Sequence, residues 1–170
     1  MLIFIDVETS GVNPEVHGIV SLGAVTETGE EFYREYRLED SLAISPEALA
    51  VNGFAATELR AHDKDTATEA AKDFAKWVNQ FDNVQFAGWN VGFDRVFMYR
   101  YMIPFSRSEH HYHWLDVASY FQILNGNYCG LHYACISLNI KPEPKIHNAL
   151  TGAKKCREVY YELLNQSMEG

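Results

Sequence analysis

The chain has 170 residues, of which 47% are hydrophobic and 14% aromatic, a composition that suits one globular core. Fourteen Lys and Arg against 23 Asp and Glu give a net charge of −9, which argues against a protein that grips long duplex nucleic acid through its phosphates. No stretch reaches the roughly 18 apolar residues of a membrane span, so we expect no membrane partner. With no linker or repeat in view, we predict a single domain over residues 1–170.

The apolar pattern predicts strands and helices in a mixed order. We expect strands over 2–5, 19–26, 32–38 and 84–88, and helices over 66–81, 93–102, 116–124, 131–138 and 149–164. Thr66 and Glu69 fit a capping box at the start of the first of these helices. Strands in a meander, followed by strands that alternate with helices, predict an α/β fold with a mixed sheet flanked by helices.

The cysteines and the N-terminus bear on location. Cys129, Cys135 and Cys156 form no C-x-x-C pair and are typical of reduced thiols. A strand that begins at the N-terminus leaves no room for a signal peptide. We therefore expect a cytoplasmic protein.

Two acids at the end of the first strand form the most informative motif. Asp6 and Glu8 follow an apolar run and are two residues apart, so their side chains project from the same face of a strand. Two like charges at the edge of an apolar layer repel each other unless a cation lies between them. The motif indicates a metal site, although a solvated acidic turn would have the same sequence.

Two further polar clusters lie where a helix begins. Asn90 and Asp94 follow the strand over 84–88, and His147 comes just before the helix over 149–164. A histidine at such a junction is well placed to lean over a cleft.

The three motifs occur in the order D-x-E-T, N-x-x-F-D and H-x-A, which resembles the DEDDh family of 3′–5′ exonucleases. This family includes polymerase proofreading exonucleases and oligoribonuclease-like and RNase T-like enzymes. The segment 45–54 also resembles the loop before the first helix of the family. The resemblance covers nearly the whole chain and implies a ribonuclease H-like fold.

The resemblance also implies a mechanism. Two Mg²⁺ or Mn²⁺ ions about 3.5–4 Å apart would be held by acids, with Asp6 bridging both. Glu8 would hold the ion that activates water and Asp94 the second ion. His147 would act as general base, and the product would be a nucleoside 5′-monophosphate released from a single-stranded DNA or RNA 3′ end.

Substrate contacts are expected around the acid pair. Thr9 and Ser10 could meet the terminal 3′-OH, and Asn90 could hydrogen-bond near Asp94. By resemblance, Phe54 and Trp89 could stack on the last bases, although either aromatic could equally be part of the core or the wall of a cleft.

One position departs from the family pattern. The motif continues as H-x-x-x-x-D, but the fifth residue after His147 is Gly152, so the fourth acidic ligand is missing. Glycine in a helix costs about 0.5–1 kcal/mol relative to alanine, whereas an aspartate in the first turn would gain about 0.3–1 kcal/mol from the helix dipole. We therefore interpret Gly152 as a residue that impairs function. No acid that follows it closely offers a substitute, because the nearest one is Glu158.

The remaining alternatives concern activity and partners. Because the other motif acids and His147 are present, an inactivated or weakened enzyme is favoured over a natural pseudoenzyme. A different function would be that of a non-catalytic module. Such a module would bind nucleic-acid ends, or it would bind a partner such as a polymerase or another replication or repair protein. Relatives of this kind tend to form dimers, so a homodimer is also considered.

Overall fold

The computed structural model describes residues 1–105 and 110–169, and within them five strands form one mixed sheet. The strands are β1 (Leu2–Thr9), β2 (Ile19–Thr26), β3 (Glu31–Glu35), β4 (Gln85–Gly88) and β5 (Leu115–Asp116), in the spatial order β3-β2-β1-β4-β5. β1, β2 and β3 are antiparallel neighbours, whereas β4 runs parallel to β1 and β5 parallel to β4. The predicted α/β class with a mixed sheet is confirmed.

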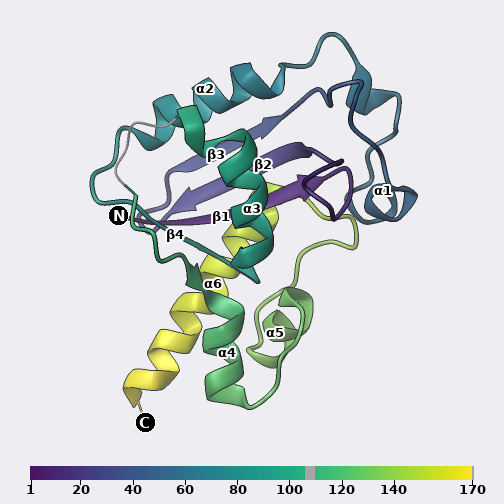
Figure 1. The fold of residues 1–170 in the computed structure, drawn as a ribbon. Helices are drawn as coiled ribbons and strands as arrows, with labels where there is room; N and C mark the ends of the chain where they lie inside the picture. The colour runs from purple at the N-terminus through teal and green to yellow at the C-terminus, as the bar shows by residue number, and fades with distance from the viewer. Residues whose placement is uncertain (106–109, 170) are drawn as a thin grey trace.

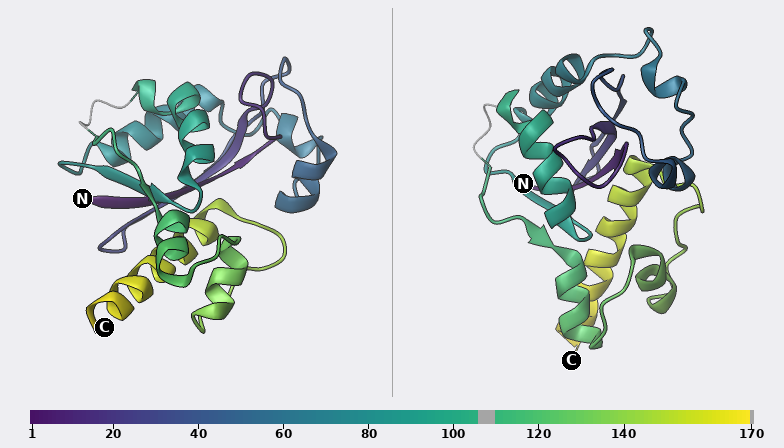
Figure 2. Two further views of the ribbon diagram at one scale, coloured as in Figure 1. Left: turned by 60° about the horizontal axis from the view of Figure 1, so that its bottom comes forward. Right: turned by 45° about the vertical axis from the view of Figure 1, so that its right-hand side comes forward.

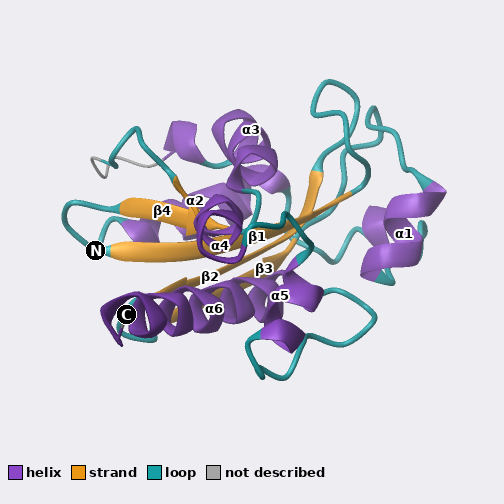
Figure 3. Ribbon diagram, turned by 90° about the horizontal axis from the view of Figure 1, so that it is seen from below, coloured by secondary structure: helices purple, strands orange, loops and turns teal. Residues whose placement is uncertain are grey.

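Helices cover both faces of this sheet (Figures 1 and 2). They are α1 (Pro46–Asn52), α2 (Ala67–Val78), α3 (Val91–Tyr101), α4 (Val117–Asn125), α5 (Leu131–Ser137) and α6 (Ala149–Glu169), with short 3₁₀ turns η1 (Glu58–Arg60) and η2 (Ile103–Phe105). Figure 3 shows α2 and α3 on one face and α6 along the other. None of the described helices is long and apolar enough to cross a membrane.

The alternation of side chains along β1 assigns each residue to one face. Ile3, Ile5 and Val7 belong to a buried cluster with residues of α2 and α3, whereas Phe4 belongs to a second cluster with α4, α5 and α6. Because alternate residues share a face, the side chains of Asp6 and Glu8 are directed to the same face as Phe4. The acid pair therefore lies on the side of the sheet that α6 covers.

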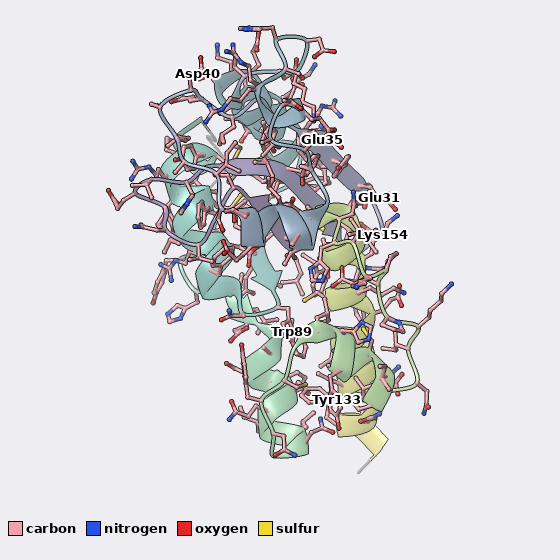
Figure 4. All side chains as sticks on the ribbon, turned by 90° about the vertical axis from the view of Figure 1, so that its right-hand side faces the viewer. Glu31, Glu35, Asp40, Trp89, Tyr133 and Lys154 are labelled. Atoms are coloured by element: carbon pink, nitrogen blue, oxygen red, sulfur yellow. The ribbon has the colours of Figure 1, made fainter. Side chains whose placement is uncertain are left out.

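Helix α6 begins in close contact with the sheet. Gly23 of β2 is paired with Asp6 of β1, and a Cβ on Gly23 would lie only 2.2 Å from the backbone carbon of Ala149. Glycine at position 23 is therefore what lets the first turn of α6 approach the sheet. The Lys154 Nζ lies 2.6 Å from the Glu31 Oε1 and joins α6 to β3 (Figure 4).

Helix α1 corrects the prediction of a loop over 45–54. Ser45 caps this helix by accepting a hydrogen bond from the Ala48 N–H, Pro46 occupies its first turn, and Gly53 ends it with a φ of 76°. These are ordinary start and stop signals of a helix. The helix is only seven residues long, which hides its apolar periodicity.

Other expected elements are confirmed with shifted ends. The capping box of Thr66 and Glu69 is present, and β2 has the bounds that its apolar run predicts. The strand expected over 32–38 ends at Glu35, although Tyr36 and Leu38 beyond it are still buried.

Candidate active site

A cleft of about 470 Å³ opens at the end of β1, beside the beginnings of α3 and α6. The four candidate catalytic side chains, which come from distant parts of the chain, all line it together with a further buried acid. These five residues are Asp6, Glu8, Asp94, Glu143 and His147. The three motifs thus meet at one cleft.

Backbone contacts hold the motifs in place. Asp94, in the first turn of α3, is only 3% exposed, and its Oδ1 accepts a hydrogen bond from the Val7 N–H at 3.0 Å. This bond joins α3 to β1 between the two acids of the first motif. The N–H of His147 donates to the Val51 carbonyl at 3.0 Å, which leaves the imidazole exposed at the cleft.

The carboxyl groups of the cleft share an unfavourable electrostatic environment. Burial, together with the negative charges of Asp94, Glu8 and Glu143, raises the pKa of Asp6 well above its usual range. Burial and the charge of Glu143 raise the pKa of Glu8 to about 7, and burial is the main reason that the pKa of Asp94 rises to about 8. Each carboxylate is therefore short of compensating positive charge.

The described lining of the cleft contains no Lys or Arg that could balance these acids. Among the described residues that line it there are five acids, with Glu47 at the rim, and no Lys or Arg. A divalent cation would supply the missing charge, since carboxylate oxygens are the ligands that Mg²⁺ and Mn²⁺ prefer. The acids that line the cleft are therefore of the right chemical type to bind such an ion.

The side chains do not yet form a finished metal site. Among the described residues, no group of three or more His, Cys, Asp or Glu side chains is arranged so that it could hold a metal ion. Mutual repulsion of the carboxylates and the hydrogen bond from Val7 to Asp94 both favour such a spread arrangement.

The raised pKa values predict how stability depends on pH. The pKa of Glu8 rises from 4.5 to about 7 and that of Asp94 from 3.8 to about 8, so between these values the folded, metal-free protein binds more protons than the unfolded chain. Stability is then greatest at the acidic end of this range and is lost as the pH rises. We expect the Tm in chelator to fall by roughly 5 °C or more from pH 5.5 to pH 8.

Differential scanning calorimetry checks this expectation. Mn²⁺ added at pH 8 should restore much of the loss, because it binds the folded state only. In the control variant Asp94→Asn the slope should be smaller. A Tm that rises from pH 5.5 to pH 8 in the parent protein would contradict the raised pKa values.

Gly152 lies directly against the first acid of the site. A Cβ at this position would be 2.2 Å from the Asp6 Oδ2 and 2.8 Å from its Cγ. A carboxylate at this position would therefore meet that of Asp6. The structure also supplies a packing reason for glycine that helix propensity alone did not, because the Asp6 carboxylate occupies the space of the missing side chain.

Three of the predicted substrate contacts line the cleft. Thr9, Trp89 and Asn90 are among its lining residues. The Thr9 hydroxyl donates to the Gly11 carbonyl at 2.8 Å, and the indole N–H of Trp89, labelled in Figure 4, donates to the Cys129 carbonyl at 3.2 Å. Trp89 is thus fixed as a wall of the cleft.

Ser10 and Phe54 lie outside the cleft lining. Ser10 is fully buried, and its hydroxyl donates to the Ala43 carbonyl at 2.7 Å, so the hydroxyl serves the turn after β1 and is withdrawn from any 3′-OH. Phe54 packs against a small apolar cluster around Leu59, and the Lys64 Nζ lies 4.9 Å from the centre of its ring. Neither residue is placed to contact a substrate in this cleft.

Asp116 lies just before α4, yet its side chain makes no capping hydrogen bond to the backbone of that helix. Instead its Oδ1 accepts from the N–H groups of Asn90 at 2.9 Å and Val91 at 3.4 Å. Asp116 therefore fixes the start of α3, which carries Asp94.

Glu143 is the cleft residue that the sequence did not reveal. It stands between two prolines in the segment Lys141–Lys145, whose composition is typical of a solvated loop. In the structure it is only 7% exposed. No periodic pattern marks such a position, so its burial emerges only from the fold.

Comparison with known proteins agrees with the fold and the motifs. Residues 1–164 match the family model described as the 3′–5′ exoribonuclease Rv2179c-like domain. The 3′–5′ DNA exonuclease Cap18 of Escherichia coli is 28% identical over 171 residues, which cover 94% of this chain and 89% of Cap18.

Solved structures show the same architecture at low identity. The nuclease domain of 3′hExo, a DEDDh family member bound to rAMP, has a TM-score of 0.72 and 16% identity, over 99% of this chain and 93% of that domain. The zinc-bound complex of E. coli ExoI with single-stranded DNA has a TM-score of 0.74 and 19% identity, over 99% of this chain. The chain spans only 41% of ExoI and 60% of a full-length 3′-exonuclease that it also resembles. The chain therefore belongs to the family of Rv2179c-like 3′–5′ exoribonuclease domains, and it shares the ribonuclease H-like fold of the DEDDh family member 3′hExo.

Proposed function

We propose that this protein is a metal-dependent 3′–5′ exonuclease that removes nucleoside 5′-monophosphates from single-stranded 3′ ends. The observation that carries the proposal is the meeting of Asp6, Glu8 and Asp94 with His147 in one cleft whose described lining contains no Lys or Arg. Phosphate groups cannot approach so many carboxylates without cations. Membership of a 3′–5′ exonuclease family supports the same reaction.

The proposed roles follow from the position of each residue. Asp6, Glu8 and Asp94 would hold two Mg²⁺ or Mn²⁺ ions, with Asp6 shared between them. When bound, these ions would make water a stronger nucleophile and stabilise the charge on phosphate and leaving group. His147 would accept a proton from the water that attacks the terminal phosphorus. The P–O3′ bond then breaks, leaving a shorter chain with a 3′-OH and a free nucleoside 5′-monophosphate.

The activity of this chain should be reduced by Gly152. With no carboxylate at the position facing Asp6, we propose weaker metal binding and slower turnover than an aspartate at position 152 would give. The rival account is a module that binds 3′ ends without cutting them, and Gly152 is the feature that favours it. A metal titration and a nuclease assay separate the two accounts.

The test of the function is release of labelled mononucleotide from 3′-labelled single-stranded DNA and from its RNA counterpart. Both substrates are needed, because the matching family is named for RNA and Cap18 for DNA. We expect release that requires Mg²⁺ or Mn²⁺ and stops with chelator. Tight binding of the labelled ends without any release, at all metal concentrations, would favour the binding module.

Replacing the proposed general base should lower the rate and leave metal binding intact. For His147→Ala we expect kcat to fall by roughly 10²–10⁴-fold, since that is the usual contribution of a general base. His132→Ala is a matched control, because His132 is another exposed histidine of the cleft. Calorimetric titration with Mn²⁺ should give the parent affinity for both variants. Equal losses of rate in the two variants would argue against a specific role for His147.

A further inference from the structure

Glu143 is a buried acid of the cleft to which the proposed mechanism gives no task. It lies in the segment between α5 and α6, is 7% exposed, and lines the cleft together with Asp6 and Glu8. Glutamate is among the residues least often buried unless it is paired. Its position therefore calls for a partner.

The hydrogen bonds of Glu143 do not provide that partner. Its Oε2 is fully buried and has no hydrogen-bond partner, and its Oε1 lies 3.9 Å from the Nδ1 of His147, which is beyond hydrogen-bond distance. Burying a carboxylate oxygen without a partner is costly. Burial raises the pKa of Glu143 against the opposing charges of His147 and His132, which lower it, yet no described group forms a hydrogen bond with its Oε2. This oxygen is therefore open to a further partner.

The surroundings of Glu143 indicate what this partner is. Glu143 lines the same cleft as Asp6 and Glu8, and its negative charge adds to burial in raising the pKa of both acids. Gly152, where the fourth acid of the family would stand, faces the same Asp6 from α6. Glu143 therefore shares a cleft with Asp6, the carboxylate that the empty side-chain position at 152 faces.

We propose that Glu143 supplies the fourth carboxylate of the metal site in place of the aspartate that is missing at position 152. The proposal deepens the proposed function, on which it rests, by adding a ligand from the loop before α6. A glutamate has one more methylene than an aspartate, which gives it reach from this loop into the cleft. Glu143 precedes His147 in the chain, whereas the nearest acid after Gly152 is Glu158.

The experiment measures Mn²⁺ binding directly, by isothermal titration and by the electron paramagnetic resonance signal of free Mn²⁺. Glu143→Gln removes the charge and keeps the shape, and we expect the Kd for Mn²⁺ to rise at least about tenfold. Glu47→Gln is the matched control, since Glu47 is an exposed acid at the rim of the same cleft. It should change the Kd less than about twofold, because its charge is screened by water.

A second background tests the substitution itself. In Gly152→Asp the fourth acid is present, so adding Glu143→Gln there should raise the Kd for Mn²⁺ less than about threefold. The effects of the two substitutions on the Kd should therefore be strongly non-additive. Equal losses in both backgrounds, or an unchanged Kd in the parent background, would overturn the proposal. If Glu143→Gln shifts only the pH profile of the nuclease reaction, Glu143 positions His147 and is not a ligand.

The outcome does not depend on nuclease activity. Should no variant release mononucleotides, the proposed function fails, yet a Mn²⁺ affinity that drops with Glu143→Gln still supports the ligand role. Circular dichroism and a thermal melt without metal check folding. We expect Glu143→Gln to melt no lower than the parent, because it removes a buried charge that has no partner.

Discussion

Replacing Asp6 by Asn should remove nearly all exonuclease activity and leave the metal-free protein at least as stable as the parent. Metal ions contribute several kcal/mol of charge stabilisation to a transition state of this kind, which corresponds to a rate loss on the order of 10³-fold. Asp6 is central because Asp94, Glu8 and Glu143 all act on its charge. Asparagine keeps the size of the side chain but cannot share two negatively charged oxygens between two ions.

The stability of Asp6→Asn separates loss of ligand from loss of fold. Asp6 is a buried acid among other acids, so a neutral side chain relieves repulsion in the absence of metal. The Tm in chelator should therefore be equal to or above that of the parent at pH 8, whereas the stabilisation by Mn²⁺ should disappear. An Asp6→Asn protein that retains both activity and stabilisation by Mn²⁺ would contradict the proposed site.

Local signals predicted most of the fold. The apolar run over 19–26 gave the strand β2, and the pattern Thr66-x-x-Glu69 gave the start of α2 with its capping box. These features depend on neighbours in the sequence, which is why one sequence suffices for them. The short α1 carried cap signals at Ser45 and Gly53 but too few residues to show a helical period.

The sequence predicted the site residues that belong to local motifs. It did not predict the residue that only the packing of the chain brings to the cleft. Asp6, Glu8, Asp94 and His147 each stand beside the end of a strand or the start of a helix, so their convergence follows from the topology. The burial of Glu143 depends on how a loop folds back over the cleft, and no local pattern encodes that.

The same distinction bears on Ser10. Its proximity to Asp6 and Glu8 in sequence suggested a substrate contact, but the chain turns at the end of β1. There the Ser10 hydroxyl accepts from the Gly18 N–H at 3.1 Å and donates to Ala43. Closeness in sequence is thus a poor guide to a site once the strand has ended.

Restoring an acid at position 152 should raise the activity, but only if the new carboxylate and Asp6 are held together by metal. A Cβ at this position would lie 2.2 Å from the Asp6 Oδ2, so any side chain here forces Asp6 to move. In Gly152→Asp the displaced carboxylate and the new one can share a cation, which offsets their repulsion. We expect the rate with Mg²⁺ or Mn²⁺ to rise at least about tenfold, corresponding to about 1.4 kcal/mol of transition-state stabilisation.

Gly152→Ala is the matched control, because it introduces the same Cβ without a carboxylate. Alanine suits a helix better than glycine, by about 1 kcal/mol at most, yet here it displaces Asp6 and offers no ligand in return. Its rate should therefore fall below that of the parent, while Gly152→Asp rises above it. If both variants lose activity equally, the cause is the clash of the new Cβ with Asp6, whether or not a carboxylate is present. Glycine is then the residue that this site requires at position 152.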